Sequence, residues 1–253
     1  MLATDGIARL LAFACFLGLM GTVTPATKLG TNCLAKSPDL NECVKNIAQG
    51  IFNNMHLGFK EVGVPVMDPL QVVKMDIING QGSVVLNLEL FNTSHTGLSK
   101  VTVDKVVADP EKYSLDMYIT VPNYNIEGLY KAKGKIIVLP IQGEGNSYFR
   151  FFGIKGVWKI KGEPKVKNGK THMKITKFDV EIVPKDLKMR LDNLFNGNKE
   201  LGEQMNNFLN QNWEEVYTQL KPIIEDSFSQ IMQSFGNRAL DKIPYNQIFH
   251  DIS

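Results

Sequence analysis

The sequence predicts an α+β fold in which a long, kinked C-terminal α-helix is wrapped by a highly curved antiparallel β-sheet, with a short N-terminal helix. Three observations support this prediction. Apolar residues have helical spacing after residue 37, alternate with a period of two over residues 71–183, and return to helical spacing over residues 201–236. No linker rich in proline, glycine or serine separates these blocks, so we expect one domain over residues 27–253.

The first 26 residues have the features of a secretory signal peptide. Arg9 precedes an apolar run over residues 10–21, and small residues up to Ala26 provide a cleavage zone. The run is shorter than the roughly 20 residues that a membrane-spanning helix needs, although an N-terminal anchor helix is the alternative. We therefore expect residues 1–26 to be removed and the rest to be secreted to the extracellular space, without stable insertion in a membrane.

Cys33 and Cys43 are the only cysteines after residue 26. In an oxidising compartment, a lone close pair favours a disulfide, which would tie the start of the mature chain to the first helix. The four histidines are scattered without metal-ligand spacing, so no metal site is expected. Asn92 begins an Asn-Thr-Ser sequon and is a candidate glycosylation site.

The first helix is predicted from its N-terminal residues and its apolar spacing. Ser37 can act as N-cap, Pro38 suits the first helical position, and Asp39 favours the positive end of the helix. Apolar residues then recur at helical spacing: Leu40, Cys43, Val44, Ile47 and Ile51. This pattern predicts one amphipathic helix.

Residues 71–183 predict antiparallel strands with one buried face. The alternating apolar residues include Val84, Leu86, Leu88 and Leu90, and further along Tyr113, Leu115, Met117, Ile119 and Val121. Asn168 and Gly169 suit a type I′ hairpin turn. Glycines also fall inside the strands, at Gly128, Gly134, Gly153 and Gly156. Strand glycines often mark bulges or sharp coiling, so we favour a strongly curved sheet over ordinary turns.

The C-terminal helix is expected to be long and to bend at its centre. Half of its surface is apolar and the other half is polar and expected to face water, and Gly236 is the predicted stop. At 1.5 Å per residue the helix would reach about 50 Å, so it needs an equally long apolar cover. The curved sheet can provide that cover if Pro222, which lacks the N–H that would bond to Thr218, kinks the helix. The alternatives are a coiled-coil partner, which the apolar period disfavours, and a plain break into two packed helices.

The sequence contains none of the catalytic motifs that we searched for. There is no GxSxG, HExxH, P-loop or GxGxxG motif, and the carboxylates lie on solvated faces. A net charge of only +2, without a basic cluster, argues against nucleic acid as a partner. The GVWKI stretch at residues 156–160 resembles the GxW motif of lipocalins, but it lies too far along the chain. We therefore expect no catalytic residue and no cofactor.

Two long apolar faces remain, one on the helix and one on the sheet. Space between them would suit a long, uncharged, water-insoluble ligand, whereas the alternative is a solid core. Burial of about ten methylenes would contribute roughly 8 kcal/mol, which corresponds to about micromolar affinity without a charged anchor. Tyr217 could also donate a hydrogen bond to a ligand oxygen. The predicted ligand-binding residues are Phe208, Trp213, Val216, Tyr217, Leu220, Ile223 and Ile224 on the helix, with Leu86, Leu88, Met117 and Ile119 on the strands.

Essentially the whole mature chain resembles the takeout and juvenile-hormone-binding protein family of insects. The resemblance rests on the signal peptide, the Cys33 and Cys43 pair, GVPVMDPLQV at residues 63–72, NQNWEEVYTQLKPIIEDSF at residues 210–228, and LDKIPYNQIF at residues 240–249. It implies a tubular lipid-binding fold whose hydrophobic tunnel holds terpenoids, fatty acids or quinones. Hormone-binding members typically carry further cysteines, which this chain lacks, so the resemblance favours the takeout branch.

These observations predict a secreted, monomeric carrier of a small hydrophobic ligand. The resemblance implies a role in feeding, circadian or chemosensory physiology. The alternatives are a juvenile hormone-binding haemolymph carrier, a lipid-acting enzyme with an unfamiliar site, and an interaction protein whose apolar helix docks on a partner.

Overall fold

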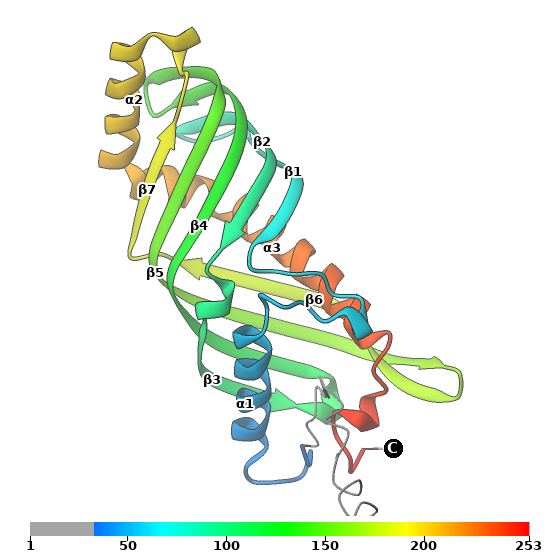
Figure 1. Ribbon diagram of the computed structural model, residues 1–253. Coiled ribbons are helices and arrows are strands. Elements are labelled where there is room, and N and C mark those ends of the chain that lie inside the picture. The colour runs from blue at the N-terminus through cyan, green and yellow to red at the C-terminus, as the bar shows by residue number, and fades with distance from the viewer. Residues whose placement is uncertain (1–32, 253) are drawn as a thin grey trace, which may run out of the picture. The chain divides into compact units, whose positions relative to one another are not determined.

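The computed structural model describes residues 33–252, so the predicted signal peptide lies outside the described residues. The helices and strands are α1 (Leu40–Asn53), β1 (Leu70–Asn79), β2 (Val84–Thr96), β3 (Thr102–Asp109), β4 (Ser114–Ile136), β5 (Leu139–Lys167), β6 (Lys170–Val183), β7 (Asp186–Leu191), α2 (Lys199–Gln211) and α3 (Trp213–Leu240). The predicted α+β class, with a helix before the strands and helices after them, is confirmed (Figure 1).

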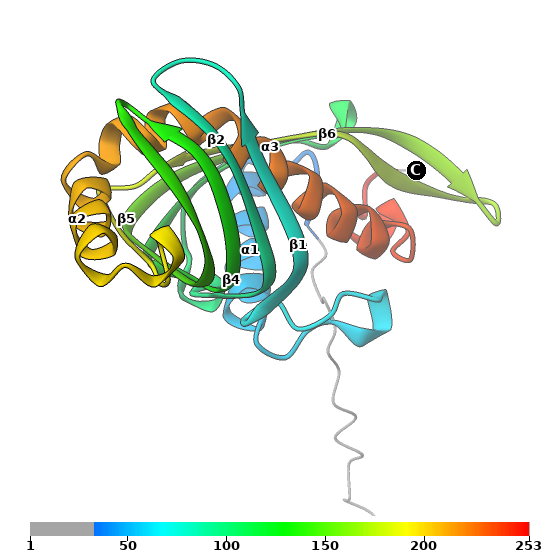
Figure 2. The ribbon, with the colours of Figure 1, turned by 90° about the horizontal axis from the view of Figure 1, so that it is seen from above.

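All the described strands form one antiparallel sheet, in which β4 and β5 are long enough to serve two sets of neighbours. β4 has 23 residues and β5 has 29. β4 pairs with β3 near its start and with β2 further along, and β5 pairs with β7 and β6 over different stretches. Because strands twist, strands of this length coil, and the sheet curls around one side of α3 (Figure 2). The predicted wrapping of the C-terminal helical region by a curved sheet is confirmed.

Local backbone features set the turns and the close packing of the sheet. Asn168 and Gly169, between β5 and β6, have positive φ angles of 50° and 71°, as the predicted type I′ turn requires. At Gly134 in β4, an added Cβ would lie 2.1 Å from the carbonyl oxygen of Val85 in β2. Only glycine permits such a close approach of two strands, in agreement with the expectation that strand glycines accompany sharp coiling.

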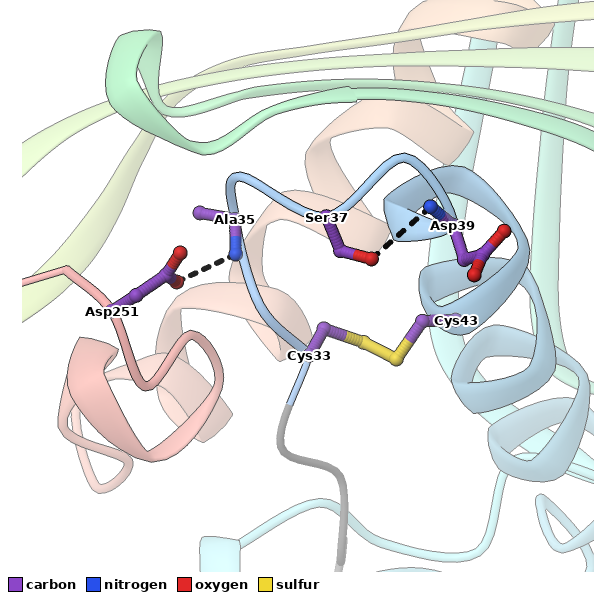
Figure 3. Close-up of a disulfide and its surroundings, with 6 residues drawn as sticks. All are labelled: Cys33, Ala35, Ser37, Asp39, Cys43 and Asp251. Atoms are coloured by element: carbon purple, nitrogen blue, oxygen red, sulfur yellow. Dashed lines mark hydrogen bonds between the residues drawn. A yellow bond between two sulfur atoms is a disulfide. The ribbon is translucent and has the colours of Figure 1, made fainter.

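The predicted disulfide between Cys33 and Cys43 is confirmed, with an S–S distance of 2.01 Å (Figure 3). It joins the segment before α1 to the side of that helix. The same segment pairs with the C-terminal segment, since the Cys33 N–H donates to the Ile248 carbonyl at 3.2 Å. The Ala35 N–H donates to the Asp251 carboxylate at 2.6 Å (Figure 3). The disulfide therefore links the C-terminal segment, through its paired neighbour, to α1.

The first helix begins at Leu40, later than predicted from Ser37. The Ser37 hydroxyl oxygen accepts a hydrogen bond from the Asp39 N–H at 3.2 Å (Figure 3). A separate turn joins the Leu40 N–H to the Ser37 carbonyl. Ser37 therefore caps a turn that precedes the helix rather than the helix itself.

The predicted long C-terminal helix is confirmed by α3, which has 28 residues and contains Pro222, but the region from residue 201 is divided into two helices. The interruption lies at Asn212, whose φ of −113° and ψ of 24° are not helical. Its side-chain amide donates to the Phe208 carbonyl at 2.8 Å, so the side chain competes for a backbone acceptor of the last turn of α2. Pro222 lies inside α3, and residues on both sides of it remain helical. The chain changes direction between α2 and α3, which lets α2 cover β7 while α3 lies along β6 (Figure 1).

The predicted helix stop at Gly236 is wrong, because α3 continues to Leu240. Gly236 instead permits close packing of the helix on β6, where an added Cβ would lie 2.6 Å from the Cδ1 atom of Ile175. The next residue, Asn237, accepts from the Ile175 N–H at 2.7 Å and donates to the Ile175 carbonyl at 3.0 Å. Gly236 therefore lies at a helix–strand contact and is not a C-cap.

The sequence predicts that the polar side of α3 faces water. In the structure, some of its side chains instead form hydrogen bonds to the edge of β6. The Ile182 N–H donates to the Glu225 carboxylate at 2.6 Å, and the Val180 N–H donates to the Ser229 hydroxyl at 3.0 Å. Side chains four residues apart lie on one helix face, which matches residues two apart on a strand edge. The helix thus covers backbone groups that an open edge strand would leave unpaired.

Candidate ligand-binding site

A cavity of about 50 Å³ lies between α3 and the inner face of the sheet. Nearly all of its lining is apolar, and its one charged lining residue, Glu181, is exposed at the surface. The lining residues are Leu98, Ile119, Val121, Tyr124, Phe151, Ile154, Gly156, Trp158, Val180, Glu181, Ile182, Ile224, Phe228 and Met232. These residues come mainly from β4, β5, β6 and α3, so the cavity lies where the sheet meets the helix.

The cavity is much smaller than a typical ligand pocket, which has a volume of about 300–1,000 Å³. Large side chains occupy most of the space between α3 and the sheet, where a tunnel was expected. Phe228 of α3 packs edge-on to Tyr124 of β4, with ring centroids 5.8 Å apart, and Phe151 of β5 lies 6.4 Å from Tyr124. A lipid therefore needs these aromatic side chains, or α3 itself, to shift away from the sheet.

Two of the predicted ligand-binding residues, Ile119 and Ile224, line this cavity. Six others are buried in the core without lining it: Leu86, Leu88, Met117, Val216, Tyr217 and Leu220. Phe208, Trp213 and Ile223 are partly exposed and pack against the edge of the core. The structure therefore brings the predicted strand and helix residues to one apolar interior, of which the cavity occupies a part.

Two of the predicted residues have specific surroundings. The Tyr217 hydroxyl donates to the Ile182 carbonyl at 2.9 Å, so its proton is used by the edge of β6. Trp213 lies at the junction of α2 and α3, beside a surface hollow lined mainly by polar residues such as Asn212 and Glu215.

A sequence model described as haemolymph juvenile hormone binding protein matches residues 10–250 of the chain. The chain belongs to this family. Two relatives, each named circadian clock-controlled protein daywake, come from Drosophila yakuba and Drosophila melanogaster. Each is 25% identical over 215 residues, which cover 82% of this chain and 83% of the relative. The crystal structure of Takeout 1 from Epiphyas postvittana superposes with a TM-score of 0.74 at 28% identity, covering 88% of this chain and 100% of that one. The resemblance to the takeout and juvenile-hormone-binding family is confirmed.

In this family member, sequence reasoning missed several cavity-lining residues, of which Phe228 and Met232 are the clearest. They follow Ile224 at intervals of four, on the same face of α3. Extending the helical spacing beyond Ile224 would have identified both residues. Tyr124 and Phe151 face each other across β4 and β5, and neither residue belongs to a motif that would have distinguished it from other core aromatics.

The inner wall also contains a chain of three polar side chains. Thr93 and His95 of β2 are fully buried, and Tyr124 of β4 is nearly so. The Thr93 Oγ1 atom lies 2.8 Å from His95 Nε2, and His95 Nδ1 lies 3.0 Å from the Tyr124 hydroxyl. Burial lowers the pKa of His95 to about 4 and raises the pKa of Tyr124. The imidazole is therefore neutral near pH 7, and its low basicity makes it a poor general base there.

The described residues offer neither a metal centre nor a membrane-spanning helix. No group of three or more histidine, cysteine or acidic side chains in residues 33–252 could hold a metal ion. In the same range, no helix is long and apolar enough to cross a membrane. The arrangement at the cavity is suited to binding an apolar molecule.

Proposed function

We propose that this protein is a secreted carrier that binds a small hydrophobic ligand between α3 and the inner face of the sheet. The apolar cavity at this position is the observation on which the proposal depends. Membership of the haemolymph juvenile hormone binding protein family supports the proposal, as does the similarity to Takeout 1. Terpenoids, fatty acids and similar lipids have the required apolar surface.

The composition of the cavity wall suits a ligand held by burial of apolar surface. Each buried methylene contributes about 0.8 kcal/mol, so an apolar chain needs no ion pair to bind. Met232 adds a flexible side chain that can adapt to ligands of different shape. Phe228 and Tyr124 set the width of the closed cavity, and we expect them to move apart when a ligand binds.

Two features fit a protein of the extracellular space. The Cys33–Cys43 disulfide is stable in an oxidising compartment. Asn92 is exposed, so its sequon is accessible for glycosylation if the chain passes through the secretory pathway. The disulfide and the sequon together support export, for which residues 1–26 would be the signal.

The family description makes juvenile hormone one candidate ligand. The daywake relatives, which are named as circadian clock-controlled, favour a circadian role over a feeding or chemosensory one. A lipid-acting enzyme and a helix-mediated interaction protein are less well supported, because the described cavity offers no general base poised near pH 7 and because the apolar side of α3 is covered by the sheet.

The proposal is tested by titration with phenylnaphthylamine, an apolar dye whose fluorescence rises on binding. Wild-type protein should bind the dye, and Ile224→Trp, which fills the cavity, should weaken binding at least about tenfold. Leu201→Trp places the same side chain at an exposed position on α2 and serves as the matched control. If wild type does not bind the dye, or Ile224→Trp binds it equally well, the ligand does not occupy this cavity.

Native mass spectrometry of protein from its own tissue addresses the natural ligand. A carrier should retain a lipid of defined mass, and extraction then identifies the lipid. Steady hydrolysis of p-nitrophenyl esters would instead support an enzyme. A molecular mass in light scattering that corresponds to a dimer would contradict the expectation of a monomer.

A further inference from the structure

A β-bulge in β2 turns two polar side chains toward the interior. Up to Leu90, the buried residues of β2 have even numbers. The register with β4 then shifts between Phe91 and Ser94, and the buried residues become the odd-numbered Thr93 and His95. Regular alternation would have left both on the opposite face of the sheet. The bulge therefore accounts for their inward position.

The facing strand leaves room for this arrangement. An added Cβ at Gly128 of β4 would lie 2.7 Å from the Cγ2 atom of Thr93 and 2.8 Å from its Cα atom. Any larger residue at this position would push Thr93 out of place. Bulge and glycine together hold a threonine and a histidine in a wall that is otherwise apolar, where polar groups are costly to bury.

These two residues position the hydroxyl of Tyr124, the third polar member of the chain. Tyr124 lines the cavity with its ring, which lies 5.8 Å from that of Phe228, while the ring of His95 lies 6.1 Å from Phe228. Because the closed cavity has an almost wholly apolar wall, the Tyr124 hydroxyl becomes accessible to a ligand when Phe228 moves away. The Thr93 hydroxyl also lies 3.4 Å from the Val72 carbonyl, to which it donates when His95 Nε2 carries the imidazole proton. In the other tautomer, Thr93 gives up this long bond and donates to His95, so the chain can run in either direction. His95 accepts from the Tyr124 hydroxyl in one tautomer and donates to its oxygen in the other. Tyr124 therefore has a free lone pair in the first case and a free proton in the second.

We propose that Tyr124, positioned by His95 and Thr93, binds the single uncharged oxygen group of an otherwise apolar ligand. The class includes alcohols, ketones, esters and ethers, because the reversible hydrogen-bond chain matches both donors and acceptors. This inference rests on the proposed function and specifies the ligand class of the same cavity.

The surroundings of the cavity disfavour a carboxylate in this position. Among the described residues that line it there is no lysine or arginine, and the one charged residue, Glu181, is exposed and lies 3.9 Å from Lys221 Nζ. An ionised head group would have to give up its hydration without a charged partner. We therefore expect neutral oxygen compounds to bind in preference to fatty acid anions.

The experiment measures displacement of phenylnaphthylamine by decane, decanol, methyl nonanoate and decanoate. Tyr124→Phe keeps the ring and removes the hydroxyl. It should weaken decanol and methyl nonanoate about fivefold, the effect of one neutral hydrogen bond, and change decane less than about twofold. In the wild type, decanoate should bind more weakly than decanol.

The matched control is Tyr130→Phe, on the same strand. Tyr130 is also buried, and its hydroxyl donates to the Asp192 carbonyl at 2.7 Å without lining the cavity. This variant should bind all four compounds as the wild type does. Thr93→Val, which lies behind the cavity wall, is a second test if Tyr124→Phe does not fold, with an expected loss of about twofold for decanol.

The outcomes separate the two proposals. If wild type binds the dye but Tyr124→Phe weakens decane and decanol equally, or weakens neither, the polar chain is structural and this inference is wrong. The same criterion applies to Thr93→Val if Tyr124→Phe does not fold. If wild type does not bind the dye, the proposed function is itself wrong. A selective loss of the oxygen compounds, with decane retained, supports the inference.

Discussion

In both the contact between α2 and β7 and the contact between α3 and β6, polar helix side chains bind a strand edge that has no neighbouring strand among those described. The two contacts differ in the number of hydrogen bonds that each side chain makes. In the first, Asn206 accepts from the Leu191 N–H at 2.8 Å and donates to its carbonyl at 2.9 Å. Asn210 does the same with Met189, at 2.9 and 2.7 Å. Each amide thus satisfies both backbone groups of one residue.

The middle of the α3–β6 contact has fewer bonds for each side chain. Glu225 and Ser229 each accept one hydrogen bond from the strand. Tyr217 contributes one more by donating to the Ile182 carbonyl. A side chain that satisfies both groups of one residue recurs only near the end of α3.

The weaker stretch borders the cavity, since Val180 and Ile182 take part in both. The difference indicates that the closed cavity of about 50 Å³ can widen between the middle of α3 and β6. We expect α2 and the end of α3 to stay attached to the sheet while the middle of α3 moves away from β6.

The largest expected effect is at the stronger contact. Asn206→Ala leaves the buried Leu191 N–H and carbonyl without partners, at about 1–3 kcal/mol each, so the free energy of unfolding should fall by about 4 kcal/mol. Urea denaturation measures this change. The neighbouring Asn207 is exposed, and Asn207→Ala should cost less than about 0.5 kcal/mol. Equal losses of stability in the two variants would show that the hydrogen bonds of Asn206 to Leu191 do not stabilise the folded protein.

Acid should lower the free energy of unfolding through His95, which lies near the cavity. Its pKa is lowered by burial to about 4, against about 6.5 in an unfolded chain. Between these values the unfolded state binds a proton that the folded state does not, so stability falls as the pH drops from about 6.5 to about 4. At about 1.4 kcal/mol for each pKa unit, the loss is about 3 kcal/mol, and this group has no effect above that window.

His95→Leu should remove this part of the pH dependence, which thermal unfolding across the pH range measures. The comparison with wild type cancels the titration of the carboxylates, which both proteins share. If the two proteins lose stability in parallel between about pH 6.5 and 4, then His95 is not protonated on unfolding and its burial has no such effect.

A smaller effect is expected at the weaker contact. Ser229→Ala removes one acceptor and leaves the Val180 N–H without its partner, so it should lower the free energy of unfolding by about 1 kcal/mol. The same variant should speed dye uptake in stopped-flow measurements, because one bond that holds the middle of α3 is gone. Ser234→Ala, at an exposed position on the same helix, is the control. Uptake that is equally fast in all three proteins would mean that the ligand reaches the cavity by another route.

Sequence patterns predicted the parts of the fold that depend on regular periodicity. Val84 and its alternating neighbours are buried as expected, and the apolar stripe of α3 faces the sheet. The polar residues on the other side of α3 could not be assigned, because a serine that caps a strand edge has the same local pattern as one that faces water. The positions of Ser229 and Asn206 depend on strands distant in sequence.

The site was less predictable than the fold for a related reason. The bulge after Leu90 reverses the inward face of β2, so alternation alone places His95 on the wrong side. The break occurs at Asn212, whose side chain hydrogen-bonds to the Phe208 carbonyl, whereas the better-known helix breaker Pro222 is accommodated inside α3. Whether an apolar residue lines a cavity or packs in the core is decided by small differences in volume that no sequence pattern records.

Hydrogen–deuterium exchange with and without bound phenylnaphthylamine tests the central claim, that the ligand lies between α3 and β6, most directly. Without dye, the amides of Val180 and Ile182 should exchange faster than those of Met189 and Leu191. Dye should slow exchange at residues 180–182 and 224–232 and leave residues 189–191 unchanged. Protection confined to the α2–β7 contact, or no protection at all at saturating dye, would contradict this account.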